Sequence, residues 1–153
     1  GANVTLFEPP TGSPMRSKPP FASDEPGENN SLPFAYFAAN KGNLVADLRT
    51  ESGQAQLLQS AIEADVLILS DHPDAECVDI EALRSANPRL VCTRITPYGS
   101  SGPYSAFKGD DLTLMAMGGL LTMAGFPDCA PVVAFGEQGL LAGLPAHTPL
   151  AVI

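Results

Sequence analysis

One carboxylate, Glu137, stands at the entrance to an apolar stretch near the end of the chain, in the segment VVAFGEQGLLAGLPA that covers residues 132–146. The pattern predicts a loop that leads into a helix, with the helix starting within residues 137–146. A carboxylate placed at such an entrance could act as a nucleophile. The same pattern also fits the first turn of a core helix that takes part in no reaction, and the segment alone leaves both interpretations open.

Other titratable or glycine-rich positions indicate structure more than chemistry. His72 follows an acidic residue in a loop, where a solvated histidine is commoner than a catalytic one. Asp110 and Asp111 precede an apolar run, which favours helix capping over acid–base catalysis. Gly118-Gly119 lies inside an apolar helical pattern, which favours close helix packing over phosphate binding. The sequence contains no GxGxxG, GxxxxGK[ST] or GxSxG motif.

The cysteines and the net charge exclude several classes of function. Cys77, Cys92 and Cys129 form no CxxC pair, and with only two histidines they predict no metal site. Reduced thiols are typical of a cytoplasmic protein, and neither a signal peptide nor a membrane span is expected. The net charge of −9 and scattered basic residues argue against nucleic-acid or anionic-membrane partners. A small phosphate-bearing ligand remains compatible, because one or two cations suffice for it.

The elements that must position any site follow an alternation of strands and helices. Strands are expected at residues 4–8, 43–48, 65–69 and 90–95, and helices at residues 51–64, 80–86 and 112–124. Thr50 and Asp79 are suited to cap the first two helices, and Asp110 or Asp111 the third. A long irregular loop is expected over residues 9–35, because residues 9–33 hold seven of the fifteen prolines.

This order predicts an α/β fold with a mainly parallel sheet. Residues 65–69 are fully apolar, as in a strand buried on both faces of such a sheet. The length of 153 residues predicts a single domain over residues 1–153. The sheet formed by these strands would be incomplete, so we expect either a fragment or one part of a larger assembly.

Three long segments, taken in order, resemble the family III CoA-transferases. They are GANVTLFEPPTGSPMR, the segment from YFAANKGNLVADLR to ADVLI, and the segment from DIEALRSANPRLV through SSGPYSAFKGDDL to FPDCAPV. The group includes formyl-CoA transferase and carnitine CoA-transferase, with α-methylacyl-CoA racemase as a relative. The resemblance covers nearly all of residues 1–146 and corresponds to part of the N-terminal half of a family member.

The resemblance implies a fold, a cofactor and a reaction. The fold would be a Rossmann-like domain with helices on both faces of the sheet, incomplete relative to the family domain. A carboxylate attacks the acyl-CoA thioester to give a mixed anhydride and CoA thiolate, and the thiolate returns to form an enzyme–CoA thioester that the acceptor acid resolves. The substrates would be acyl-CoA and CoA, without a metal. Because members form interlocked dimers, a homodimer or pairing with a second CoA-transferase-like domain is expected.

The resemblance also implies which residues bind CoA. They are Ala46, Arg49, Ser70, Asp71, Pro73 and Ala75. A cation at Arg49 fits a nucleotide phosphate, although a solvated charge at a helix start explains this arginine equally well. Three positions depart from the family pattern: Asp71 replaces an aromatic residue, Val78 an arginine and Asp110 a tyrosine. The negative charges of Asp71, Asp74 and Glu76 should weaken the affinity for polyanionic CoA.

The nucleophilic aspartate of the family has no counterpart in this sequence. Depending on the alignment anchor it falls at Gly139 or at Leu140, and neither side chain can attack a thioester. Glu137 lies two or three positions upstream, and attack geometry tolerates displacements of only about 1 Å. No catalytic residue is therefore assigned, and Glu137 stays a weak candidate.

Three functions compete at this point. The first is a divergent CoA-transferase or racemase, and the second is a non-catalytic domain that binds CoA weakly or supports an active copy structurally. The third is an α/β domain of unrelated function. The long match favours the family, and the missing aspartate favours a degenerate active site.

Overall fold

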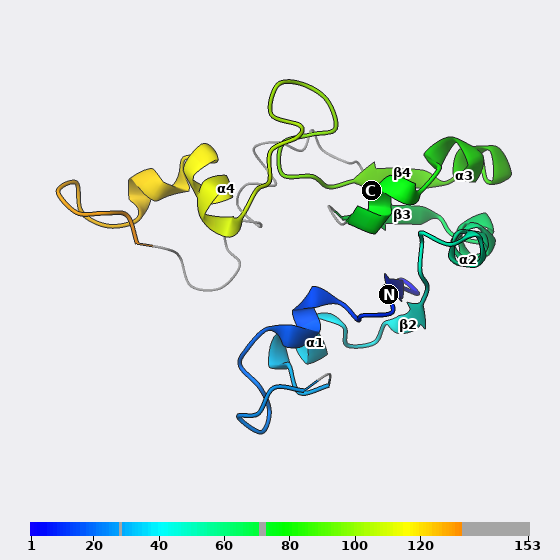
Figure 1. The fold of residues 1–153 in the computed structure, drawn as a ribbon, viewed down its shortest axis with the longest axis horizontal. Coiled ribbons are helices and arrows are strands. Elements are labelled where there is room, and N and C mark those ends of the chain that lie inside the picture. Colours follow the sequence, from blue (N-terminus) through cyan, green and yellow to red (C-terminus); the bar gives the residue numbers. More distant parts are fainter. Residues whose placement is uncertain (28, 71–72, 133–153) are drawn as a thin grey trace. The chain divides into compact units, whose positions relative to one another are not determined.

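A computed structural model describes residues 1–27, 29–70 and 73–132 of the chain (Figure 1). The chain divides into two compact units, Gly1–Asp65 with His72–Leu90 and Val66–Asp71 with Val91–Ile153, and each is described by itself. The expected single domain over residues 1–153 stays a prediction. Among the described residues, no helix is long and apolar enough to cross a membrane.

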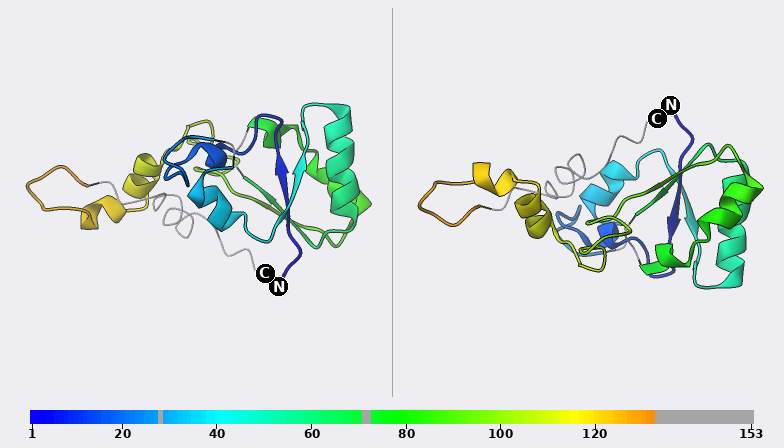
Figure 2. Two further views of the ribbon diagram at one scale, coloured as in Figure 1. Left: turned by 90° about the horizontal axis from the view of Figure 1, so that it is seen from below. Right: turned by 90° about the horizontal axis from the view of Figure 1, so that it is seen from above.

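The first unit is built on two parallel strands, β1 (Thr5–Glu8) and β2 (Gly42–Val45). Figure 2 shows them side by side and pointing the same way. Glu8 stands opposite Val45, and the Ala46 N–H donates to the Glu8 carbonyl at 2.9 Å. Both strands therefore end at the same edge, where ligands bind in most parallel sheets. The strands predicted at residues 4–8 and 43–48 are confirmed, with the second one shorter than expected.

Two helices of the first unit, α2 (Glu51–Ile62) and α3 (Ile80–Ala86), pack against each other through a small apolar core. The buried residues of these helices are Gly53, Leu57, Ala61 and Leu83. Thr50 accepts a hydrogen bond from the Gly53 N–H at 3.1 Å, and Asp79 accepts one from the Ala82 N–H at 3.0 Å. Both predicted caps are confirmed, because each side chain satisfies a helix-start N–H that has no partner within the helix.

Asn87 fastens the end of α3 to the end of α2. Its side-chain Nδ2 lies 2.9, 3.2 and 2.9 Å from the carbonyl oxygens of Ala61, Ile62 and Ala64. Its Oδ1 accepts from the Arg89 N–H at 3.1 Å. These carbonyls lie at the end of α2 or just beyond it, where helical partners run out, so one amide group helps to satisfy them.

Replacing Asn87 by aspartate should lower the free energy of unfolding by about 2 kcal/mol. Aspartate keeps the acceptor for Arg89 but loses the donor and turns a carboxylate toward carbonyl oxygens. Urea unfolding followed by circular dichroism measures the change, and Asn87→Ala, without the added charge, should lose less. Equal stability of the aspartate variant and the unmodified chain would show that the amide contributes nothing.

The proline-rich stretch is more ordered than the sequence indicated. Within residues 9–35, predicted to be an irregular loop, Pro14–Ser17 forms a 3-10 turn, η1, and the helix α1 begins at Leu32 and ends at Phe37. Ser31 caps α1 by accepting from the Phe34 N–H at 3.2 Å, and Pro33 occupies its first turn, where no N–H is needed. The sequence did not reveal α1 because six residues are too few to show an apolar period.

The second unit contains a second parallel pair, β3 (Val66–Leu69) and β4 (Val91–Arg94). These strands confirm the predictions at residues 65–69 and 90–95, and the parallel pairing confirms the predicted α/β class. A long loop follows β4 and leads to α4 (Asp111–Met117), then to a 3-10 turn, η3 (Leu120–Met123). Leu69, Leu114 and Met115 are the buried apolar residues that the structure describes in this unit.

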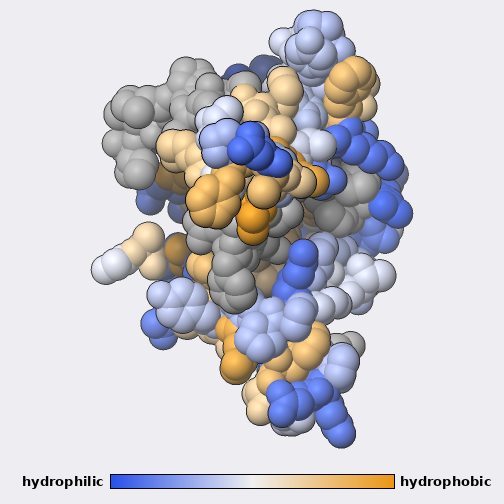
Figure 3. Space-filling view, turned by 90° about the vertical axis from the view of Figure 1, so that its left-hand side faces the viewer, coloured by the Kyte–Doolittle hydropathy of each residue, from blue (hydrophilic) through white to orange (hydrophobic). Residues whose placement is uncertain are grey.

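The prediction that β3 is buried on both faces is wrong for the described part of the chain. Val66 is 50% and Ile68 is 64% exposed, whereas Leu69 is 7% exposed. Successive side chains of a strand point to opposite faces, so Val66 and Ile68 share one face. Within the described residues, β3 pairs with β4 alone. Apolar residues also reach the surface on the face drawn in Figure 3, where they are interspersed with hydrophilic ones.

The prediction of a single helix over residues 112–124 is also wrong. Gly118 ends α4 at Met117, and Gly119 takes a φ of +81°, which begins the separate turn η3. Residues that carry a side chain adopt this backbone conformation far less readily than glycine does. The two glycines therefore interrupt the helix. A Cβ added to Gly119 would meet no described atom within 4 Å, so Gly119 is not the site of the predicted close helix packing, and for Gly118 that packing stays a prediction.

Candidate functional site

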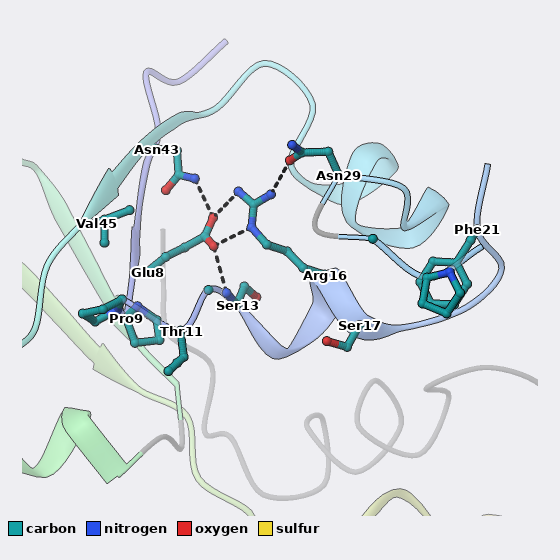
Figure 4. A pocket seen from close by; sticks show the side chains of 14 residues that line it. Glu8, Pro9, Thr11, Ser13, Arg16, Ser17, Phe21, Asn29, Asn43 and Val45 are labelled. Atoms are coloured by element: carbon teal, nitrogen blue, oxygen red, sulfur yellow. Dashed lines mark hydrogen bonds and ion pairs between the residues drawn. The ribbon is translucent and has the colours of Figure 1, made fainter. Parts of the chain in front are cut away.

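The most elaborate polar arrangement that the structure describes surrounds the carboxylate of Glu8, at the end of β1 (Figure 4). Glu8 is 4% exposed. Arg16 Nε donates to its Oε2 at 2.7 Å, and Arg16 Nη2 donates to its Oε1 at 2.9 Å. The Ser13 N–H donates to Oε2 at 2.8 Å, and Asn43 Nδ2 donates to Oε1 at 2.6 Å. We call Glu8, Ser13, Arg16 and Asn43 the Glu8 cluster.

Local structure explains how the four residues of the Glu8 cluster meet. Leu6 is paired with Asn43 and Glu8 with Val45, so Glu8 and Asn43 are diagonal neighbours on one face of the strand pair. Beyond Glu8 the chain turns back at Gly12, whose φ is +79° and whose N–H donates to the Pro9 carbonyl at 2.8 Å. Ser13 then caps η1, which brings Arg16 opposite Glu8.

The surroundings of Glu8 lower the pKa of its carboxyl group. The hydrogen bond from Arg16 is the largest cause, burial opposes it, and the Ser13 N–H, the Arg16 charge and Asn43 lower the pKa further. Glu8 is therefore ionised at neutral pH, with two donors on each oxygen. A carboxylate so occupied and so buried is unsuited to attack a thioester, and the cluster has the character of a structural support.

A pocket of about 660 Å³ borders the cluster. It is lined by Glu8, Pro9, Pro10, Thr11, Gly12, Ser13, Arg16, Ser17, Phe21, Pro26, Gly27, Asn29, Asn43 and Val45. Its charged groups face each other, as Figure 4 shows, with Arg16 Nη1 also donating to Asn29 Oδ1 at 2.9 Å. Glu8 and Arg16 therefore contribute to the pocket wall as a hydrogen-bonded pair.

Acid should weaken the first unit through Glu8. Its folded-state pKa lies below the ordinary value of 4.5, so its stabilisation is fully present above about pH 4.5 and is lost as the pH falls through the lowered value. Urea unfolding between about pH 7 and pH 3 should show a gap between the unmodified chain and Glu8→Gln that narrows with acid. A gap that stayed constant would contradict this assignment.

Two of the predicted CoA-binding residues lie at the carboxyl end of β2. Ala46 follows the strand directly and is 6% exposed, and Arg49 is exposed just ahead of α2. The Arg49 N–H donates to Asp47 Oδ1 at 3.0 Å. These two residues share the strand edge at which Glu8 and Pro9 leave β1.

The other predicted CoA-binding residues are spread over the chain. Pro73 begins the 3-10 turn η2 (Pro73–Cys77) in the first unit, and Ala75 within it is 8% exposed. Ser70 is exposed directly after β3 and belongs to the second unit. Asp71 lies outside the described residues. The six assignments remain predictions.

The segment that carries Glu137, Gly139 and Leu140 also lies outside the described residues, as does the helix start expected at residues 137–146. His72 lies outside them too. Within residues 1–27, 29–70 and 73–132, no three His, Cys, Asp or Glu side chains are grouped so that they could hold a metal ion.

Asp110 is a helix cap, as predicted. Its Oδ1 accepts from the Thr113 N–H at 2.8 Å, and Thr113 Oγ1 accepts from the Asp110 N–H at 2.9 Å. This reciprocal capping box lowers the pKa of Asp110, chiefly through the Thr113 N–H.

Sequence reasoning missed the Glu8 cluster. A signal was present in EPPTGSPMR, where a glutamate ends an apolar strand and an arginine follows eight residues later. A charged residue that is buried where a strand ends requires a partner. The turn at Gly12, which makes Arg16 that partner, is not visible in the spacing alone.

Parallel strands alternating with helices, with polar residues gathered where the strands end, define an α/β protein of the kind that binds ligands at a sheet edge. The model of CoA-transferase family III matches residues 1–141, and the chain belongs to this family. The resemblance seen in the sequence is thereby confirmed.

Curated relatives of the chain include proteins named as CoA-transferases. The chain is 38% identical over 141 residues to the succinyl-CoA:(R)-benzylsuccinate CoA-transferase subunit BbsE of Thauera aromatica, covering 90% of this chain and 34% of that protein. It is 37% identical over 141 residues to a succinate–glutarate CoA-transferase of Agrobacterium fabrum, covering 88% and 35%. The chain thus spans about a third of the length of the curated relatives it matches.

A solved structure supports the fold. The crystal structure of a CAIB/BAIF family protein from Brucella suis matches with a TM-score of 0.74 at 32% identity. The match covers 95% of this chain and 40% of that one. The α/β arrangement with parallel strands therefore corresponds to part of a CAIB/BAIF protein.

Proposed function

We propose that this chain is a CoA-binding part of a family III CoA-transferase that does not supply the reaction's nucleophile. The proposal is supported by the family pattern, which puts Gly139 or Leu140 where the family has its nucleophilic aspartate, in a chain that belongs to the family. The hydrogen of Gly139 and the isobutyl side chain of Leu140 have no lone pair with which to attack a thioester. Without a carboxylate at that position, the chain forms neither the mixed anhydride nor the enzyme–CoA thioester.

CoA would bind at the carboxyl edge of β1 and β2. The support is the position of Ala46 and Arg49, which the family pattern assigns to CoA and which flank this edge together with Pro9. Arg49 would place its charge beside a phosphate, just ahead of the first turn of α2, where helix N–H groups also favour an anion. The sequence also puts Asp71, Asp74 and Glu76 in the loop that the family pattern assigns to CoA, and their charges would oppose this attraction, so the affinity is expected to be weak.

Pairing with a second CoA-transferase-like chain would complete the reaction. One relative, BbsE, is named as a subunit of its CoA-transferase, and the Chloroflexus aurantiacus succinyl-CoA–L-malate relative is named as an alpha subunit. A partner of this kind would supply the missing carboxylate, and a homodimer of this chain would not. We place the pair in the cytoplasm, where the free thiols of Cys77, Cys92 and Cys129 would stay reduced.

Calorimetric titration with CoA and an acyl-transfer assay test the proposal together. The chain alone should bind CoA weakly and catalyse no transfer from acyl-CoA to a carboxylic acid. Arg49→Gln should weaken CoA binding about tenfold, which is the loss of one charge-assisted contact, whereas the exposed Arg84→Gln should leave it unchanged.

The contrary results are separable. Transfer by the chain alone that disappears in Glu137→Gln would make Glu137 a working nucleophile and the chain an enzyme. Absence of CoA binding at millimolar concentration would leave a structural role instead. Transfer gained by Gly139→Asp or Leu140→Asp would show that the missing carboxylate is the element that the site lacks.

A further inference from the structure

Arg16 joins three segments of the first unit that are far apart in sequence. Its guanidinium donates to Glu8 at the end of β1 and to Asn29 Oδ1 at 2.9 Å. Its Cζ also lies 3.9 Å from the centre of the Phe34 ring, in α1. The side chain is 18% exposed. One residue therefore connects the strand pair, the polar loop and a helix.

The loop that contains Arg16 is closed on itself by other contacts. We call residues 9–27 and 29–31 the strap. The Ala22 N–H donates to the Asn30 carbonyl at 2.8 Å, and Phe21 and Ser31 form an antiparallel bridge. Ser31, 1% exposed, places its Oγ 2.9 Å from the Met15 carbonyl oxygen and 2.7 Å from that of Lys18. The two limbs of the strap are thus fastened to each other independently of Glu8.

The attachment of the strap to the strand pair is concentrated at Glu8. The Ser13 N–H and two guanidinium nitrogens of Arg16 all donate to this one carboxylate. A small folded loop held to a sheet through one ion pair has a defined position while the pair is intact. Without the pair, it keeps its own fastening at Ser31 but loses the contacts that fix it to the sheet.

The attachment point lies beside the proposed CoA edge. The Glu8 carbonyl accepts the Ala46 N–H at 2.9 Å, and Pro9 and Pro10 follow Glu8 directly. Pro9, Pro10 and Val45 line the same pocket. The position of the strap therefore determines how the chain leaves β1 next to Ala46.

We propose that Glu8 and Arg16 form a positioning pair that fixes the strap, and through it Pro9 and Pro10, as a preformed wall of the CoA site. The proposal rests on the CoA-binding function proposed above. Neither residue contacts CoA in this scheme. Preformed walls raise affinity because the ligand does not have to order them.

Arg16→Gln in the full chain, with two control variants, tests the proposal. Arg84→Gln removes the same charge from an exposed ion pair on α3, in which Arg84 Nη1 lies 3.5 Å from Glu81 Oε1. Asn87→Ala destabilises the same unit away from the strap. Amide hydrogen exchange reports the position of the strap through the Ser13 N–H, and calorimetry reports the affinity for CoA.

In Arg16→Gln the Ser13 amide should exchange about ten- to a hundredfold faster, and CoA should bind about tenfold more weakly. Arg84→Gln should change neither quantity, and Asn87→Ala should change neither at temperatures well below its own unfolding. Arg16→Lys, which keeps the charge but loses the two-pronged contact, should fall between Arg16→Gln and the unmodified chain.

Three results would overturn this proposal while leaving the proposed function standing. An unchanged Ser13 amide in Arg16→Gln would show that the pair does not hold the strap. Faster exchange with unchanged CoA affinity would show that the strap does not shape the site, while leaving CoA binding itself intact. Equal weakening of CoA binding in Asn87→Ala would assign the effect to general stability. Absence of CoA binding in the unmodified chain would refute the proposed function instead, and with it the role of this wall.

Discussion

Gly53→Ala should lower the free energy of unfolding by about 3 kcal/mol or more, the largest effect expected of any single methyl group in the first unit. Gly53 is buried in the first turn of α2, and a Cβ there would overlap the carbonyl oxygen of Asp47. That carbonyl cannot move freely, because it accepts from the Thr50 N–H at 3.0 Å and from Thr50 Oγ1 at 2.8 Å. Relief of the overlap would break the turn that caps α2.

Urea unfolding followed by circular dichroism measures this loss. Gly42→Ala is the matched control, because a Cβ on Gly42 would lie 3.6 Å from Thr5 Oγ1, an ordinary contact. The control should change the unfolding free energy by less than about 1 kcal/mol. Equal stability of Gly53→Ala and Gly42→Ala would contradict the close approach of α2 to the Asp47 turn.

Glu8→Ala should cost about 3 kcal/mol at neutral pH, because it leaves the Arg16 guanidinium and the Ser13 N–H without their carboxylate. Removing one member of a buried ion pair is more harmful than removing both, so Arg16→Ala made in the Glu8→Ala background should add little. A double-mutant cycle from the four unfolding curves measures the coupling between the two side chains. Strictly additive losses would show that Glu8 and Arg16 act independently.

Local signals predicted the elements whose ends are set by one side chain. Thr50, Asp79 and Asp110 each cap the helix expected after them, because an N-cap needs only a hydroxyl or carboxylate at the right distance from an N–H. The glycine pair after Met117 was interpreted wrongly, since an apolar period suggests a continuing helix regardless of glycine. The positive φ of Gly119 depends on the chain path around it.

Some residues of the candidate site were likewise predictable from the sequence, and others were not. The family pattern located Ala46 and Arg49, and the structure places them at the shared edge of β1 and β2. The family pattern gave no role to Glu8 or Arg16, because the contact between these two residues depends on the turn at Gly12 and on the closure of the strap by Ser31. The exposure of Val66 and Ile68 was not predictable either, since a strand's sequence shows apolarity and not what lies against it.

The most direct test of the proposed function is mass spectrometry of the chain after incubation with an acyl-CoA, recorded first under native and then under denaturing conditions. A chain that binds CoA but lacks the nucleophile should show the added mass of the ligand in the native spectrum and lose it on denaturation. An added mass that survives denaturation, is removed by hydroxylamine and is absent in Glu137→Gln would contradict the proposal and identify a working carboxylate.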